Sequence, residues 1–274
     1  MSDARAPGAR PAAPGPVRID VLGMPVSATS YTEVVDLIGC RPTDRAYVVA
    51  VCNVHSVMSA RRDPQLRAAI IRADLATSDG MPLVWYLRLM GRAEQTRVYG
   101  PDLMRVSLRA GVARGWTHYL YGTTETTLDR LEEGIASYAP GARIAGRYAP
   151  PYRPLSRPEE DAVVADITSS GADIVWVGLG MPRQELFMHR IAPRLPGVAL
   201  IGVGAAFDLI SGTIPQAPPW LQRMGLEWLF RLWQEPRRLW RRYIINNPLF
   251  AVVAASQIIR YRVQRRIHPR GVAE

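Results

Sequence analysis

The chain has 274 residues, enough to bury a large core, and it carries a formal net charge of +10. All 34 basic residues are arginine and only two cysteines occur, so a fold built on several disulfides is excluded and reduced thiols in the cytosol are expected. No segment reaches the roughly 18 uninterrupted apolar residues of a membrane-spanning helix.

Composition divides the chain into three regions. Residues 1–17 are rich in Ala, Pro, Gly and Arg and lack the apolar segment of a signal peptide, so we expect a disordered tail. Residues 18–217 alternate apolar runs with helical patterns, which indicates one α/β domain. Residues 218–274 form a basic, Trp-rich appendage, which from Arg223 onward holds 11 arginines and only three glutamates. Such concentrated positive charge indicates an anionic partner.

Short apolar runs mark the predicted strands. They suit strands buried on both faces of a parallel sheet, so the predicted fold class is α/β, with a Rossmann-like, mostly parallel sheet flanked by helices and a C-terminal helical appendage. Strands are expected at Arg18–Leu22, Tyr47–Val51, Ala73–Thr77, Trp116–Tyr121, Arg143–Tyr148, Ile174–Val177 and Val198–Gly202, and helices at Thr29–Ile38, Pro64–Ile71 and Leu83–Met90, with a turn at residues 23–25.

Polar residues follow two of these strands. Asn53 either caps the next helix or offers a donor and an acceptor at the sheet edge, and capping is slightly favoured. Asp79 either caps the helix that follows or, among apolar neighbours, serves as a general base of raised proton affinity. Arg97, in a loop before a glycine, could pair with phosphate or with Asp102.

The segment Ala172–Arg190 predicts a strand, a glycine turn and a helix start. Gly178 and Gly180 permit tight turns and close approach of another molecule, and Pro182 suits the first position of a helix. Free amides there would form an anion site, to which Arg183 and Gln184 could add donors. A plain strand-to-helix connection would give the same pattern, and spacing alone does not separate the two.

Two further patterns bear on cofactors. Gly202 and Gly204 start a Gly-x-Gly pattern, but the rest of a dinucleotide fingerprint is missing, so no dinucleotide cofactor is expected. No Asp-x-Asp pair occurs, which leaves charge neutralisation to arginines and helix amides. In the proline-rich loop at residues 149–158, Tyr152 could stack on a base or pack the loop, and packing is favoured.

The appendage interleaves tryptophans with arginines. This pattern is typical of a helix lying on an anionic bilayer. The alternatives are an Arg/Trp helix packed on the protein's own core and a nucleic-acid surface, and membrane binding is favoured because the apolar content is too high for a solvated helix that reads a nucleic-acid groove. We expect Pro236 and Pro248 to break the appendage into short helices, with a final helix at Leu249–Ile267.

Five sequence blocks resemble the WecG/TagA/CpsF glycosyltransferases of bacterial surface polysaccharide synthesis. They occur in the family's order between Val21 and Phe250: SDGMPLVW at 78–85, RVYGPDL at 97–103, VGLGMPRQE at 177–185, GVGAAFD at 202–208 and GLEWLFRL at 225–232.

The resemblance implies an inverting, metal-independent enzyme of surface or cell-wall polymer synthesis. Such an enzyme moves an N-acetylmannosamine-type or related hexose from a UDP-sugar to a polyprenyl-diphosphate-linked acceptor, with no cofactor and no nucleic-acid partner. It would lie peripherally on the inner face of the cell membrane. The alternative is a non-catalytic accessory protein of another transferase, and the sequence leaves the oligomeric state open.

The same resemblance assigns roles to individual residues. Asp79 would take the proton from the acceptor hydroxyl. The other assignments are Arg97 and Gln184 in the reaction pocket, Asn53, Gly178, Gly180, Asp208 and Tyr152 on the donor, and Arg231, Arg237 and Arg238 on the acceptor diphosphate. Val51, where the family often has Thr, and Gln216, where it often has a basic residue, are departures that leave the sugar specificity and one phosphate contact open.

Overall fold

A computed structural model describes residues 15–267 of the chain. The predicted tail at residues 1–17 falls mostly on residues 1–14, outside the described part. The last residues of the predicted appendage, 268–274, also lie outside it.

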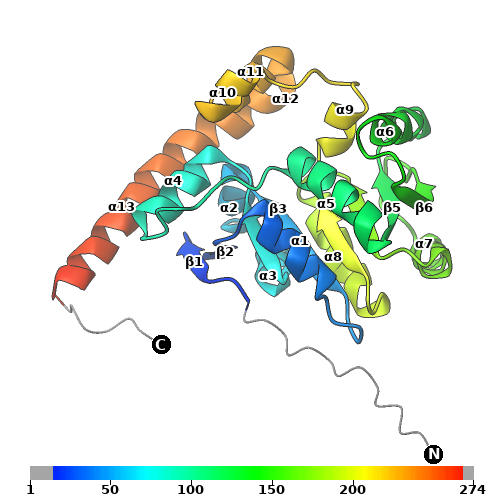
Figure 1. Cartoon of the computed structure of the whole chain (residues 1–274). Coiled ribbons are helices and arrows are strands. Elements are labelled where there is room, and N and C mark those ends of the chain that lie inside the picture. Colours follow the sequence, from blue (N-terminus) through cyan, green and yellow to red (C-terminus); the bar gives the residue numbers. More distant parts are fainter. Residues whose placement is uncertain (1–14, 268–274) are drawn as a thin grey trace, which may run out of the picture.

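A six-stranded sheet forms the centre of the molecule (Figure 1). Its spatial order is β4-β3-β8-β7-β5-β6, and each neighbouring pair is parallel. The strands are β3 (Tyr47–Cys52), β4 (Leu75–Ser78), β5 (Thr117–Gly122), β6 (Arg143–Tyr148), β7 (Ile174–Gly178) and β8 (Ala199–Gly202). The predicted α/β class with a parallel sheet is confirmed.

A separate two-stranded hairpin precedes the sheet. Its strands, β1 (Arg18–Val21) and β2 (Met24–Ser27), pair antiparallel. The prediction of a turn at residues 23–25 was wrong by two residues. Leu22 and Gly23 make the turn because both adopt positive φ, 55° and 89°, and Met24 and Pro25 already belong to β2.

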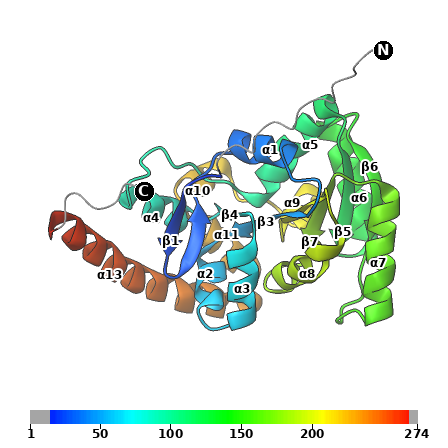
Figure 2. The ribbon, with the colours of Figure 1, turned by 90° about the horizontal axis from the view of Figure 1, so that it is seen from below.

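Helices cover both faces of the sheet (Figure 2). Side chains of α1, α5, α6 and α9 share one buried cluster, whereas α7 and α8 pack on the opposite face and α2, α3 and α4 pack around the hairpin. The helices are α1 (Tyr31–Gly39), α2 (Val54–Ala60), α3 (Pro64–Arg72), α4 (Met81–Leu89), α5 (Gly100–Arg114), α6 (Glu125–Tyr138), α7 (Arg157–Ser170), α8 (Arg183–Ile191) and α9 (Ala206–Ile210), with a 3-10 turn at Ala192–Arg194.

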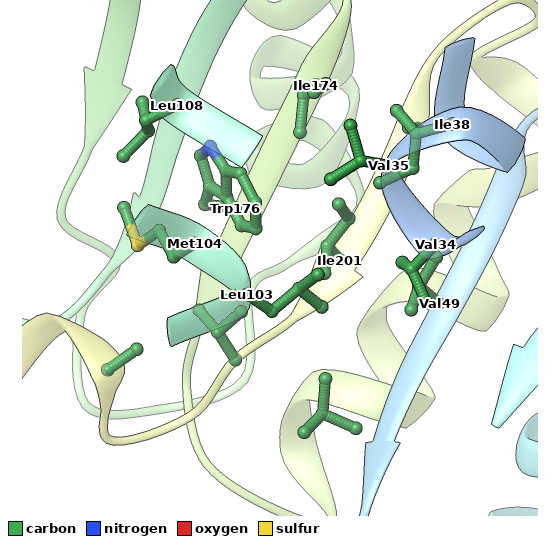
Figure 3. Close-up of a cluster of buried hydrophobic side chains, with 14 of the residues drawn as sticks. Val34, Val35, Ile38, Val49, Leu103, Met104, Leu108, Ile174, Trp176 and Ile201 are labelled. Carbon is green, nitrogen blue, oxygen red and sulfur yellow. The ribbon is translucent and has the colours of Figure 1, made fainter. Parts of the chain in front are cut away.

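The largest buried cluster lies between the sheet and α1 and α5 (Figure 3). Trp176 of β7 lies at its centre, fully buried, and donates its indole N–H to His118 at 3.2 Å. Alternate residues of β7 face opposite clusters, with Ile174 and Trp176 on one side and Val175 and Val177 on the other. This explains why the strand is apolar at every position.

The helices that follow the neighbouring strands β3 and β8 lie on opposite faces of the sheet. The helix after β3, α2, packs on one face, and the helix after β8, α9, packs on the other. Helices that leave adjacent parallel strands toward opposite faces open a crevice at the carboxyl ends of those strands, where α/β proteins bind their ligands.

The appendage begins with two short helices, α10 (Pro219–Arg223) and α11 (Glu227–Gln234). It continues through α12 (Pro236–Trp240), a π-helical turn (Arg241–Ile245) and α13 (Asn246–Ile267), which follow one another without a gap. Pro236 starts a helix as expected, but the expected break at Pro248 was wrong. Pro248 is the third residue of α13, inside a helical run that is continuous from Pro236 to Ile267. The residue four positions before it, Ile244, lies in the π-helical turn, where the helix departs from the α-helical hydrogen-bond ladder that a proline interrupts.

The appendage packs against the sheet domain along α13 (Figure 1). Phe250 and Ala254 are buried in the cluster that α2, α3 and α4 form with the hairpin. Gln257 accepts from the Leu22 amide at 2.9 Å and donates to Asp20 at 2.9 Å. None of the helices in residues 15–267 combines the length and apolar character needed to cross a bilayer.

Candidate active site

A cavity of about 840 Å³ opens at the carboxyl edge of the sheet. Residues after four strands line it: Asn53 after β3, Asp79 after β4, Gly178 at the end of β7, and Val203 after β8. A second cavity of about 100 Å³ lies between the start of α4 and the appendage. Both cavities are bordered by Asn53, His55, Asp79, Tyr99, Arg231 and Arg242.

Asp79 lies on the wall that the two cavities share. The cap position of α4 is Gly80 and no side chain caps that helix, so the capping interpretation of Asp79 is wrong. Its Oδ1 is buried and has no hydrogen-bond partner among the described residues. Burial raises the pKa of this carboxyl, the nearby Arg97 opposes the rise, and the charge of Glu227 adds to it.

Asn53 caps α2, which confirms the favoured interpretation. Its Oδ1 accepts from the amides of His55 at 3.0 Å and Ser56 at 3.2 Å. The same side chain helps to lower the pKa of Asp79, against the larger effect of burial. Asn53 therefore fixes the end of β3 and also faces the carboxylate from the floor of both cavities.

Arg97 pairs with an appendage residue and not with Asp102, which is paired with Arg105 instead. Its Nη2 lies 2.7 Å from Glu227 Oε2 and 3.6 Å from Asp79 Oδ1. Its Nε donates to the backbone carbonyl of Asp79. Arg97 borders the small cavity and does not line the large one.

The glycine turn after β7 forms one wall of the large cavity. Gly180 has φ of +70°, which favours glycine, whereas Gly178 is needed because the ring of Phe207 would lie 2.6 Å from any Cβ there. The close approach that a glycine permits at position 178 is therefore that of the Phe207 side chain. Helix α8 begins at Arg183, one residue after Pro182.

Gln184 and Glu185 are buried beside the same wall. Gln184 is 4 % exposed and donates to Glu185 Oε1 at 3.0 Å, while its own Oε1 and Glu185 Oε2 have no hydrogen-bond partner in residues 15–267. Burial raises the pKa of Glu185 to about 7, and the bond from Gln184 opposes the rise. The pair therefore offers an acceptor and a carboxyl that titrates near neutral pH to whatever occupies the cavity.

Tyr152 and Asp208 line the large cavity at other points of its rim. The expectation that Tyr152 packs its loop was wrong, because the side chain is 93 % exposed and its only ring contact in the described chain is the Arg183 guanidinium, 4.7 Å from the ring centre. Burial raises the pKa of Asp208, and Arg238 and Arg231 oppose the rise.

Arginines of the appendage face the large cavity. Arg231 and Arg238 line it, whereas Arg237 is exposed and does not. Arg241 and Arg242 also line it. The Nε atoms of Arg231 and Arg242 are buried with no hydrogen-bond partner in the described part of the chain. Burial lowers the pKa of Arg242, and so do the neighbouring charges of Arg231 and Arg238. Arginines gathered at one cavity, two of them with such buried Nε atoms, are suited to a polyanionic ligand.

Three residues of this site were not predicted. Glu227 lies in the GLEWLFRL block at 225–232, which could have drawn attention to it, but only its contact with Arg97 shows what it does. His55 follows Asn53 in a helix start, and its Nδ1 receives the Asn246 side-chain amide at 3.1 Å and lies 3.2 Å from Ser59 Oγ. Burial lowers the pKa of His55 to about 4, so it is neutral at pH 7. Arg242 could have been found as one of the arginines next to a tryptophan.

Two further observations concern metal binding and the position of Gln216. Among residues 15–267, no group of three or more His, Cys, Asp or Glu side chains lies close enough to hold a metal ion. Gln216, the departure noted in the sequence, accepts from Arg105 at 3.3 Å on α5.

The chain matches known proteins over most of its length. The family model described as "Glycosyl transferase WecG/TagA/CpsF family" matches residues 19–264. Two similar proteins are both named N-acetylglucosaminyldiphosphoundecaprenol N-acetyl-beta-D-mannosaminyltransferase. The one from Bacillus spizizenii (strain ATCC 23059 / NRRL B-14472 / W23) is 31% identical over 196 residues, covering 72% of this chain and 74% of the relative. The one from Bacillus subtilis (strain 168) is 29% identical over 210 residues, covering 77% and 79%.

Proposed function

We propose, from the premise that this chain belongs to the WecG/TagA/CpsF glycosyltransferase family, that it transfers an N-acetylmannosamine-type sugar from UDP to a polyprenyl-diphosphate-linked acceptor sugar. The names of the two relatives give the transferred sugar and the lipid diphosphate acceptor, and the proposal extends these to this chain. The observation that carries the proposal is the position of Asp79, a carboxylate whose buried Oδ1 has no hydrogen-bond partner among the described residues, on the wall between two cavities.

The reaction we propose is a single displacement with inversion at the anomeric carbon. Asp79 takes the proton of the acceptor hydroxyl while that oxygen bonds to the anomeric carbon and the bond to UDP breaks. The raised pKa of Asp79 makes it a stronger base than an ordinary carboxylate, while it remains able to ionise. Because one base and one leaving group suffice, no covalent sugar intermediate is needed.

The large cavity suits the donor. Its volume of about 840 Å³ falls within the range of roughly 300–1,000 Å³ for small-molecule sites. Gln184 offers its unpaired oxygen to the sugar, and Asp208 is placed to accept the uracil N–H. Tyr152 is exposed on the rim, where its ring could stack on the base once Arg183 turns to the phosphates.

The charge of the departing diphosphate is countered by arginine in this proposal. Arg231, Arg238 and Arg242 bring guanidinium groups to the large cavity, and two of them have buried, unpartnered Nε atoms in the described chain. Bidentate guanidinium contacts match phosphate geometry, so these residues could do without a metal ion what a divalent cation does elsewhere. They are also placed to hold the acceptor diphosphate, whereas Arg237 lies away from the cavity.

We also propose that the appendage holds the protein on the inner face of the cell membrane. Large apolar side chains are exposed on α10, α11 and α12, and Trp85 of α4 adjoins them beside Gly225. Arg223, Arg237 and Arg241 are exposed among them. Apolar side chains flanked by arginine suit the interface of an anionic bilayer. Between residues 219 and 240 the exposed set is Trp220, Met224, Leu229, Trp233 and Trp240.

The test is a transfer assay with purified full-length protein. UDP-N-acetylmannosamine and an undecaprenyl-diphosphate-linked N-acetylglucosamine acceptor would be supplied in anionic vesicles with EDTA present, and UDP release would be measured. We expect release that requires the acceptor and continues in EDTA. No release with any UDP-sugar would contradict the enzyme and favour a non-catalytic accessory protein. Release only after a divalent cation is added would contradict the metal-independent step alone.

A further inference from the structure

Glu227 contacts the centre of the site from outside the sheet domain. It is the first residue of α11, and its side chain is only 12 % exposed. Its Oε2 accepts from Arg97 at 2.7 Å and its Oε1 accepts from the Tyr99 hydroxyl at 2.8 Å. The Arg97 guanidinium also stacks over the Tyr99 ring at 3.9 Å. Three side chains from two regions therefore fix one another beside Asp79.

The two carboxylates next to Arg97 are not equivalent. Arg97 Nη2 is at hydrogen-bond distance from Glu227, 2.7 Å, but 3.6 Å from Asp79 Oδ1, which has no hydrogen-bond partner in the described residues. An arginine beside a buried carboxylate ordinarily forms a close charge-assisted hydrogen bond with it. Here that bond goes to Glu227 instead, which explains why an oxygen of Asp79 stays unpaired.

We propose that Glu227 is a positioning residue for sugar transfer: it holds the Arg97 guanidinium away from Asp79, so that the carboxylate stays free to receive the proton of the acceptor hydroxyl. This inference rests on the proposed function, and it adds a role for the appendage in the chemistry itself. A carboxylate paired closely with Arg97 would be a weaker base and would have its lone pairs occupied.

The charged and titratable groups around Asp79 favour this role. Tyr31, Tyr99 and Cys52 are neutral near pH 7, because burial raises the pKa of each, that of Tyr31 to about 12. Glu227 is the carboxylate whose negative charge raises the pKa of Asp79. The groups that interact electrostatically with Asp79 include Arg97 and Tyr99 before and at the start of α5, Glu227 and Arg231 from α11, Arg242 from the π-helical turn, Asn53 and Cys52 from the end of β3, and Tyr31 from α1.

The direction of the effect follows from these charges. In Glu227→Gln the negative charge is lost and Arg97 is released toward Asp79, and both changes lower the pKa of Asp79. Deprotonated Asp79 would then persist to lower pH but would accept a proton less readily. Glu227→Asp keeps the charge and should keep most of the wild-type behaviour.

The experiment uses the full chain and two independent readouts. The first is the midpoint of the Asp79 side-chain carboxyl in a ¹³C NMR pH titration, identified by its absence in Asp79→Asn. The second is the pH profile of kcat/KM for UDP release. We expect Glu227→Gln to lower the midpoint and the acidic limb of the profile by about one pH unit or more. The plateau rate should fall at least about tenfold, toward the roughly 10²- to 10⁴-fold that a general base contributes.

A matched control separates this role from simple attachment of the appendage. Glu132 of α6 is also a glutamate paired with an arginine, Arg147, at 3.1 Å. Glu132→Gln should change neither the Asp79 midpoint nor the pH profile. A Glu227→Gln protein whose Asp79 midpoint is unmoved would overturn the inference, even if its melting temperature and rate fall, because Glu227 would then only pin α11. Absence of UDP release by the wild type would contradict the proposed function, and the NMR titration would still decide the role of Glu227.

Discussion

The sheet domain and the appendage are stabilised in different ways. In the sheet, a central strand such as β7 is buried on both faces, and side chains such as Ile174 and Trp176 are fully inaccessible. In the appendage, large side chains such as Trp233, 80 % exposed, and Val252 lie in solvent. The buried hydrophobic side chains of the described appendage are few: Leu239, Tyr243, Phe250 and Ala254.

Polar contacts between the two regions lie at the cavities and, through Gln257, at the hairpin. Glu227 bonds Arg97, and Asn246 bonds His55. The sheet domain therefore depends on apolar burial for its stability, whereas the appendage gives its charged residues to the site and its apolar residues to the surface. The site therefore takes residues from both the well-packed sheet domain and the largely exposed appendage.

The largest difference should appear when one tryptophan is truncated in each region. Trp176→Ala removes a fully buried ring and leaves His118 without its donor, so we expect the free energy of unfolding to fall by about 3–5 kcal/mol. Trp233→Ala removes an exposed ring and should change it by less than about 0.5 kcal/mol. Urea denaturation of both variants makes the comparison. Equal losses would show that the appendage is stabilised like the core.

A smaller effect concerns the buried carboxyl behind the large cavity. The folded-state pKa of Glu185, about 7, exceeds its usual 4.5, so its protonation stabilises the fold below about pH 4.5 and this contribution is lost as the pH rises through 7. Glu185→Gln should therefore be more stable than the wild type at pH 8, by up to about 3 kcal/mol. The difference should vanish near pH 4.

Thermal unfolding across this pH range makes the measurement. Glu159→Gln is the control, because Arg153 and Ser156 hold the pKa of Glu159 below its usual value and its loss should not stabilise the protein at pH 8. If Glu185→Gln stabilised the protein equally at pH 4 and pH 8, the buried carboxyl would not be the cause.

The smallest effect on stability should accompany a clear effect at the membrane. Trp233→Ser should leave the melting temperature unchanged but weaken sedimentation with anionic vesicles by roughly tenfold, because a ring that enters the interface contributes about 1.5–3 kcal/mol. Trp233→Phe, which keeps an apolar ring, should retain most of the binding. Unchanged binding of Trp233→Ser would place the membrane contact elsewhere on the protein.

The strands and the neighbourhood of Asp79 were predictable because local patterns encode them. Apolar runs such as 174–177 have few other uses than a buried strand, and parallel strands bring their carboxyl ends, where Asn53 and Asp79 were expected, to one edge. The place of Gln184 in the pocket followed from the family resemblance. The cap of α2 by Asn53 followed from its position before a helix.

Features that depend on tertiary contacts were not predictable. The sequence does not show that Glu227 reaches Arg97, since the two are separated by 130 positions. Nor does it show that Gly178 faces the Phe207 ring or that Tyr152 faces solvent. Proline signals also misled, because the helical run that contains Pro248 continues through it directly after a π-helical turn.

The most direct test of the proposed chemistry is the transfer rate of Asp79→Asn. Asparagine keeps the size of the side chain and removes its ability to take a proton, so the variant should fold normally and still bind the UDP-sugar in a thermal-shift assay. Its rate of acceptor-dependent UDP release should fall by about 10²- to 10⁴-fold. A folded, donor-binding variant that releases UDP at the wild-type rate would contradict Asp79 as the base.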